Sequence, residues 1–322
     1  MSKKIKIWLV IATLLVLIGC IIFAGVMTVF NWDFTKLSTV EYETNDYTIS
    51  EKFKNISVDT DTADIVFIPT ENEEVKVVCY EQTKVKHLAT VIDDTLQINV
   101  VDTRKWYDYI GVFFGTPKIT VYTPKGDYGA LTINSSTGDV EIPKEYNFES
   151  IDVTQSTGDI KVYSAQSGKI KVETSTGDIC AENLTAIEID LTVSTGKVSV
   201  SDVNCEGDVK INVSTGKTML NDVKCKNIIS NGDTGDMLLK NTVSSESIFI
   251  KRSTGDVRLE GCDANELTIE TDTGSVTGSL LTDKVFITKS DTGRIDVPST
   301  TSGGKCKITT NTGNIKIKYE IE

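Results

Sequence analysis

The sequence is poor in the residues that most enzymatic and metal sites require. It contains a single histidine, His87, among 322 residues. A Ser-His-Asp or Cys-His catalytic arrangement would have to use that side chain, and a site with several histidine ligands is excluded. None of the seven cysteines belongs to a Cys-x-x-Cys pair, so zinc and redox motifs of that type are missing. We therefore expect His87 to be an ordinary surface residue, and we expect no catalytic residue, metal site or cofactor.

The chain also lacks an excess of positive charge. Its formal net charge is −13, and the charged residues among the first 30 are three lysines. The remainder holds 30 basic and 46 acidic residues, a formal charge of −16. A charge of this sign argues against binding to nucleic acid and against adsorption to anionic lipid. It is typical of a soluble domain, and it leaves cations or basic peptides open as partners.

A long apolar run occurs at the start of the chain. Residues 7–30 are uncharged, follow Lys3, Lys4 and Lys6, and precede Asp33, the first acidic residue. At about 1.5 Å per residue they cover a hydrocarbon core of about 30 Å, which predicts a transmembrane anchor within residues 1–30. The lysines predict a single-pass protein of the cell membrane, with its N-terminus in the cytoplasm and its remaining residues extracytoplasmic.

A second interpretation of this run rests on Leu17-Ile18-Gly19-Cys20, which resembles a bacterial lipobox. In that case Cys20 would be lipidated and become the new N-terminus. Apolar residues continue for ten positions past Cys20, where lipoproteins usually turn polar, so an uncleaved anchor is favoured. Both interpretations tether the same domain to the same side of the membrane.

The rest of the chain is dominated by one tripeptide, Ser/Asp/Asn-Thr-Gly, which recurs ten times at steps of 19 or 20 residues. So regular a period predicts stacked, nearly identical structural units. Glycine permits the sharp bend of a corner, and the residue two positions earlier can bond local backbone. The predicted corner glycines are Gly138, Gly158, Gly177, Gly196, Gly216, Gly235, Gly255, Gly274, Gly293 and Gly313.

Apolar residues alternate with polar ones on both sides of each glycine, mainly Val, Ile and Leu at positions −7, −5, +2 and +4. This period of two predicts a half-buried strand before the corner and another after it. Stacked about 4.8 Å apart, ten rungs would form an all-β rod of about 45 Å, a parallel β-solenoid (β-helix) with a continuous apolar interior. The second corner of each rung varies in sequence, so we expect recognition surfaces there.

The pattern divides the chain into four parts. Residues 1–30 form the anchor, residues 31–50 a polar stalk, residues 51–130 an irregular β cap, and residues 131–322 the regular solenoid. Ala63 stands where the first rung of the cap would have its glycine. In the final rung Ile315 and Ile317 alternate with charged residues, which predicts a charged guard on an exposed end.

The most aromatic stretch outside the anchor is residues 104–118. One interpretation is a hairpin that folds its rings over the open end of the core. The other is an exposed loop that contacts the membrane interface or a partner. The candidate contact residues are Trp106, Tyr107, Tyr109, Phe113 and Phe114.

Other repeated residues allow chemical hypotheses of less weight. Asp follows five of the ten glycines, at Asp139, Asp159, Asp178, Asp236 and Asp256. The Gly-Gly-x-Gly-x-Asp spacing of calcium β-rolls is missing, so solvated rows are favoured over bound calcium. Thr precedes every glycine, yet the paired Thr-x-Thr columns of an ice-binding face are missing.

Two of the seven cysteines share a column. Cys205 and Cys225 each lie nine residues past a repeat glycine on adjacent rungs. That spacing places their Cα atoms about 5 Å apart, within disulfide range. Their disulfide state stays open at this point, and the other cysteines of the domain are expected to be small buried apolar residues.

Residues 53–69, residues 119–124 and the serial Ser-Thr-Gly-Asp-[Ile/Val] motif resemble the DUF4097 family of bacterial β-strand-repeat proteins, toastrack-like domains that include candidate adhesins. The resemblance covers roughly residues 50–322. It implies a single-stranded, right-handed β-solenoid, an association of some members with envelope-stress operons, and no catalytic residues. Lys, Ser, Arg and Asn replace Asp after several glycines and depart from the commonest family motif.

We therefore expect a non-enzymatic, membrane-anchored module that binds or scaffolds at the bacterial cell envelope, in the setting of envelope-stress sensing. Envelope proteins and surface polysaccharide are the candidate partners. One alternative is a surface adhesin for external ligands. The other is a polysaccharide-active β-helix enzyme, which would need an acidic pair facing a groove beside exposed aromatic side chains.

Overall fold

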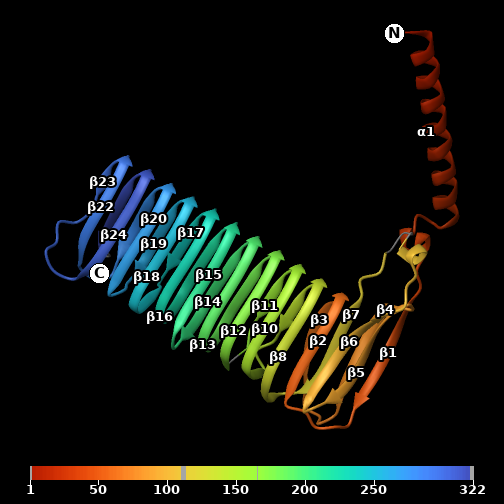
Figure 1. Ribbon diagram of the computed structural model, residues 1–322, viewed down its shortest axis with the longest axis horizontal. Coiled ribbons are helices and arrows are strands. Elements are labelled where there is room, and N and C mark those ends of the chain that lie inside the picture. Colours follow the sequence, from red (N-terminus) through yellow and green to blue (C-terminus); the bar gives the residue numbers. More distant parts are fainter. Residues whose placement is uncertain (1, 110–113, 165, 320–322) are drawn as a thin grey trace.

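The computed structural model describes residues 2–109, 114–164 and 166–319 (Figure 1). It begins with helix α1 (Lys3–Val29), where Ser2 caps the first turn by accepting a hydrogen bond from the backbone N–H of Ile5. The helix is long and apolar enough to cross a membrane. The short 3₁₀ helix η1 (Phe34–Leu37) follows and leads into the β domain.

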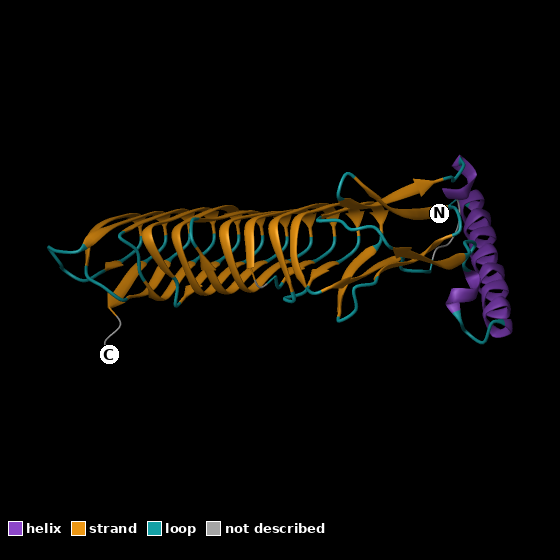
Figure 2. Ribbon diagram, turned by 90° about the horizontal axis from the view of Figure 1, so that it is seen from below, coloured by secondary structure: helices purple, strands orange, loops and turns teal. Residues whose placement is uncertain are grey.

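The β domain is a solenoid of about ten turns with two stacked strand faces (Figures 1 and 2). Two long strands each run from one corner glycine to the next, β13 (Ile179–Thr195) and β16 (Thr218–Thr234). The other strands before the corners are β8 (Gly126–Thr137), β10 (Tyr146–Thr157), β12 (Gln166–Thr176), β15 (Asp208–Thr215), β18 (Val243–Thr254), β20 (Glu266–Thr273), β22 (Lys284–Thr292) and β24 (Gly304–Thr312). Those after the corners are β9 (Val140–Ile142), β11 (Ile160–Val162), β14 (Val198–Cys205), β17 (Met237–Lys240), β19 (Val257–Cys262), β21 (Val276–Leu280), β23 (Ile295–Asp296) and β25 (Ile315–Tyr319).

Equivalent residues of neighbouring rungs stack on one another in parallel. Ile151 pairs with Leu131 on one side and with Ile170 on the other. The apolar columns therefore close into one continuous buried core that runs from the cap to the last rungs. This arrangement confirms the predicted all-β solenoid and explains the alternation of apolar and polar residues along each strand.

The repeated glycines form tight corners. Nine of the ten have φ between 132° and 157°, where residues with a side chain are strained. Stacking adds a second constraint, because a Cβ at Gly216 would lie 1.7 Å from the carbonyl oxygen of Gly196. Each corner glycine therefore lies directly against the corner backbone of a neighbouring rung.

The order of the rungs at the C-terminal end departs from the order of the chain. β24 pairs with β20 on one side and β22 on the other, and β25 lies between β21 and β23. The prediction that the last rung forms an exposed end is wrong, since Ile315 and Ile317 are buried. The inserted rung carries Ile308 at the inward position where the end rung, β22–β23, carries Thr288. At this position the inserted rung is the more apolar of the two.

The cap continues both faces of the solenoid and closes them with antiparallel strands. One face adds β2 (Asn55–Thr62), β6 (Thr95–Asp102) and β5 (Val85–Ile92) to β8. The other adds β3 (Asp64–Thr70), β7 (Lys118–Pro124), β4 (Val75–Gln82) and β1 (Tyr42–Ile49) to β9. Residues 42–49, which we expected in a polar stalk, are therefore an edge strand of the cap, whose alternating Tyr47 and Ile49 face the core.

Candidate functional site

The aromatic segment lies at the end of the cap where α1 joins the β domain. η2 (Trp106–Tyr109) follows β6 and lies at the same end of the cap as the connection from α1 (Figure 1). We call this region the helix-proximal end; it comprises residues 39–42, 82–87, 102–109 and 114–117. Three connections that are far apart in the sequence meet there, so the sequence alone does not reveal this region.

The rings of η2 point into solvent. Trp106 is 77% exposed, and Tyr107 and Tyr109 are about half exposed, at 49% and 55%. Phe114 is 43% exposed, whereas Phe113 lies outside the described residues. Among the described residues of this segment, the rings therefore do not cover the open end of the core and instead form an exposed aromatic surface.

An ion pair holds this aromatic turn in place. The Arg104 guanidinium donates to both carboxylate oxygens of Asp102, through Nε at 3.0 Å and Nη2 at 2.6 Å. It also lies over the Tyr109 ring, 4.4 Å from its centroid, and the Tyr109 hydroxyl donates to Asp102. These contacts, above all the hydrogen bond from Arg104, lower the pKa of Asp102 to about 2. The turn is thus pre-ordered without a ligand.

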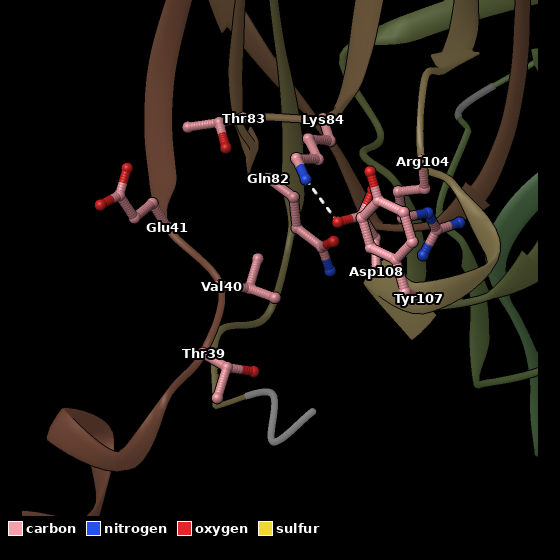
Figure 3. A pocket seen from close by; sticks show the side chains of 9 residues that line it. All are labelled: Thr39, Val40, Glu41, Gln82, Thr83, Lys84, Arg104, Tyr107 and Asp108. Carbon is pink, nitrogen blue, oxygen red and sulfur yellow. Dashed lines mark hydrogen bonds and ion pairs between the residues drawn. The ribbon is translucent and has the colours of Figure 1, made fainter. Parts of the chain in front are cut away.

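Two pockets open on either side of Arg104, and both are also lined by Gln82. The first, of about 270 Å³, lies between residues 39–41, Lys84 in the β4–β5 turn, and Tyr107 and Asp108 of η2 (Figure 3). Lys84 pairs with Asp108 across its wall. The second, of about 280 Å³, is more apolar and reaches inward to His87 between Tyr42 and Tyr109. Their mixed aromatic and polar lining suits binding of a partner or headgroup.

His87 is buried, so the prediction that it is an ordinary surface residue is wrong. It is 2% exposed, and its ring bonds Thr60 Oγ1 through Nε2 and Glu81 Oε2 through Nδ1, each at 2.7 Å. Glu81 is fully buried and also accepts from Asn45 Nδ2 at 2.7 Å. The signal was present in the alternation of β4, because Glu81 has the same parity as the buried Val77 and therefore faces inward.

Cys79 belongs to the same inward row of β4. Its thiol is fully buried, and burial raises its pKa to about 12. The ligand atoms of Cys79, Glu81 and His87 lie within 4.8 Å of one another. This cluster was missed by sequence reasoning, which weighed the histidine and the cysteines separately.

The acidic row after the corner glycines has a backbone role. Asp139 Oδ1 accepts from the N–H of Asp159 at 2.8 Å, and Asp159 does the same for Asp178. The row continues with Lys197 N–H on Asp178 and with Asp256 N–H on Asp236. Because these carboxylates bond the neighbouring rung, they are poorly suited to act as a catalytic pair.

Among the residues that the structure describes, no two cysteines are joined by a disulfide. Cys205 and Cys225 are buried at equivalent places on adjacent rungs, one position past the paired Asn204 and Lys224. Burial raises the pKa of Cys225 to about 12. Cys79, Cys262 and Cys306 are also buried, as predicted, and Cys180 is half-buried.

Comparison with known proteins gives a family model and several solved structures. A candidate adhesin from Bacteroides fragilis is 16% identical, with 86% of this chain and 97% of that chain covered, and a TM-score of 0.43. A candidate lipid-binding protein from Parabacteroides distasonis is 11% identical, with coverages of 87% and 98% and a TM-score of 0.47. No curated protein matches the chain. The model of the Toastrack DUF4097 family matches residues 53–213 and 204–322, and the chain therefore belongs to that family.

Proposed function

We propose that the protein is a non-enzymatic, membrane-anchored, extracytoplasmic binding module of the bacterial cell envelope, and that its helix-proximal end contacts the membrane interface. The observation that carries this proposal is the exposed, pre-ordered aromatic turn at the end of the cap to which α1 is joined (Figure 1). Trp and Tyr favour the interfacial layer of a bilayer because their rings are amphipathic. Arg104 and Lys105 add positive charge to the same turn of an otherwise acidic domain.

The arrangement also suits a sensor of the envelope. A rod with its contact surface at the membrane end would present the rest of the solenoid to the space outside. Deletion of the gene should then change the activity of an envelope-stress reporter and leave surface adhesion unchanged. The opposite result would favour an adhesin, and no change in either would exclude both functions. The use of the Asp row as backbone acceptors disfavours the third function, polysaccharide cleavage.

The tryptophans allow a direct test of membrane contact. The chain has three, Trp8, Trp32 and Trp106, so the variant Trp8→Phe/Trp32→Phe keeps Trp106 as its single reporter. We expect vesicles that contain lipids brominated near the headgroup to quench Trp106 fluorescence in the full chain. A matched control replaces all three by Phe and introduces Ile287→Trp, at an exposed position of the end rung of the rod. Equal quenching in the two proteins would contradict the proposed contact surface.

A further inference from the structure

The core of the cap ends in a group of buried polar side chains that the proposed binding role does not use. Cys79 and Glu81 project inward from β4, and His87 projects inward from β5. All three are 0–2% exposed. A buried carboxylate is costly unless it is paired, hydrogen-bonded or coordinated to a metal, and Glu81 is held by contacts from Asn45 and from the backbone and ring of His87. These three residue types are also the ones that bind zinc in proteins.

We propose that Cys79, Glu81 and His87 form a zinc site that fastens the two sheets of the cap together. The proposal is independent of membrane contact. The three ligand atoms lie within 4.8 Å of one another, whereas ligands of tetrahedral zinc lie about 2.0–2.3 Å from the ion. Side-chain movements of about 1–2 Å would therefore complete the site, with a water as the fourth ligand.

The surrounding hydrogen bonds suit this role. His87 contacts Thr60 through Nε2 at 2.7 Å, which fixes the ring with Nδ1 toward Glu81. Asn45 donates to Glu81 Oε1 and the backbone N–H of His87 donates to Oε2, each at 2.7 Å, so the carboxylate is held in place beside the imidazole. Such outer contacts orient ligands in most protein metal sites. The second pocket, which is lined by His87, provides a path for the ion.

Charge and donor type favour zinc over calcium or magnesium. One thiolate and one carboxylate would neutralise Zn²⁺ with a neutral imidazole, so the buried group would carry no net charge. Sulfur and nitrogen donors suit zinc, whereas calcium and magnesium prefer six or more oxygen ligands. The cluster contributes one carboxylate, so a hard cation would be poorly satisfied there.

The position explains what the ion would do. β4 and β5 are adjacent in the chain but share a single pair, Gln82 with Val85, before they diverge into opposite sheets. From that point the end of the cap is held by side chains, such as the Tyr47 hydroxyl that donates to the carbonyl of His87. A zinc ion bound by both strands would close this end, as structural zinc does in small domains.

The test uses the full chain in detergent micelles, stripped with a chelator, reloaded with zinc and dialysed. We expect about one zinc per chain by elemental mass spectrometry, and a higher thermal midpoint than in the stripped protein. Cys79→Ala and His87→Gln should each lower zinc affinity at least about tenfold. Cys306→Ala is the matched control, because Cys306 is equally buried but lies near the far end of the rod; its affinity should be unchanged.

Cobalt(II) gives a second readout that does not depend on the folding of a variant. Cobalt bound to the unmodified chain should show the near-ultraviolet charge-transfer band of a thiolate ligand, and Cys306→Ala should show the same band. If Cys79→Ala fails to fold, Cys79→Ser, which preserves volume, should fold without the band. The proposal is overturned if the unmodified chain retains no zinc, or if it binds cobalt without the thiolate band. Equal zinc affinity in Cys79→Ala would overturn it as well.

Discussion

Polar side chains that interrupt the apolar columns are hydrogen-bonded to one another inside the core. Arg252 is buried inside the solenoid, where it donates to Ser230 Oγ at 2.8 Å and Thr218 Oγ1 at 3.1 Å. Gly232 leaves space for it, since a Cβ there would lie 2.5 Å from Arg252 Nη1. Burial lowers the pKa of Arg252 to about 10. In the sequence, Ser230 and Thr218 are only exceptions to an apolar pattern; in the structure they are partners of one buried cation.

At the same scale, a corner glycine and Gly126, which begins β8, allow the effects of backbone angle and of stacking contact to be separated. Gly216 and Gly126 have nearly the same φ, 147° and 145°, yet a Cβ would clash with backbone only at Gly216. Gly126→Ala should cost about 1–3 kcal/mol of stability from backbone strain alone. Gly216→Ala should cost clearly more, because the corner must also separate from Gly196. Thermal and denaturant unfolding of both variants measures the difference, and equal losses would show that stacking contact is unimportant.

Residue burial could be predicted where the repeat sets the pattern. The prediction failed in the cap, which departs from the repeat. The inward columns of the solenoid follow from alternation, and Ala63 takes the place of a corner glycine, stacked against Gly138. His87 was misjudged because a lone polar residue in an irregular segment suggests the surface. Its burial depends on partners from β2 and β4, which are 27 and 6 residues away in the chain.

The second corners of the rungs are more regular than their sequences suggest. Four of them contain a non-glycine residue with φ between 47° and 56°, namely Asn183, Asp202, Asp222 and Asn241. Gly261, with φ of 61°, continues the row. All lie six residues past a repeat glycine, and Asn, Asp and Gly are the residues that tolerate this conformation. The second corners therefore do repeat in the sequence. What repeats is a residue that tolerates positive φ, and not one particular residue type.

The aromatic turn η2 depends on the charged state of Asp102. The pKa of Asp102 in the folded chain, about 2, lies below the value of about 3.9 for an unfolded chain. Its contribution is thus complete above about pH 4 and disappears as the pH falls through about 2. The emission of Trp106, as the single tryptophan, should stay constant from neutral pH to about 4 and change below that. Asp102→Asn should show the altered emission already at neutral pH; a normal spectrum in that variant would contradict this role.

At the scale of the whole molecule, the period establishes how many rungs there are but not the order in which they stack. Each rung offers similar upper and lower edges, so the repeat alone cannot distinguish sequential stacking from insertion of the last rung. The choice depends on which inward residues are more apolar and on a connection over residues 297–303 that can pass one rung. Both are properties of the C-terminal rungs alone, whereas the family-wide motif is the same in either order.

Engineered disulfides can establish this order. Asp272, Asp291 and Asn311 are exposed at equivalent corner positions of β20, β22 and β24, and Asn311 bonds Asp272 at 3.2 Å. Adjacent rungs bring Cα atoms about 5 Å apart, within disulfide range, whereas rungs two steps apart lie about 10 Å apart and outside it. Asp272→Cys/Asn311→Cys should therefore oxidise readily, and Asp272→Cys/Asp291→Cys should not. Sequential stacking would give the reverse result, because Asp291 would then lie next to Asp272.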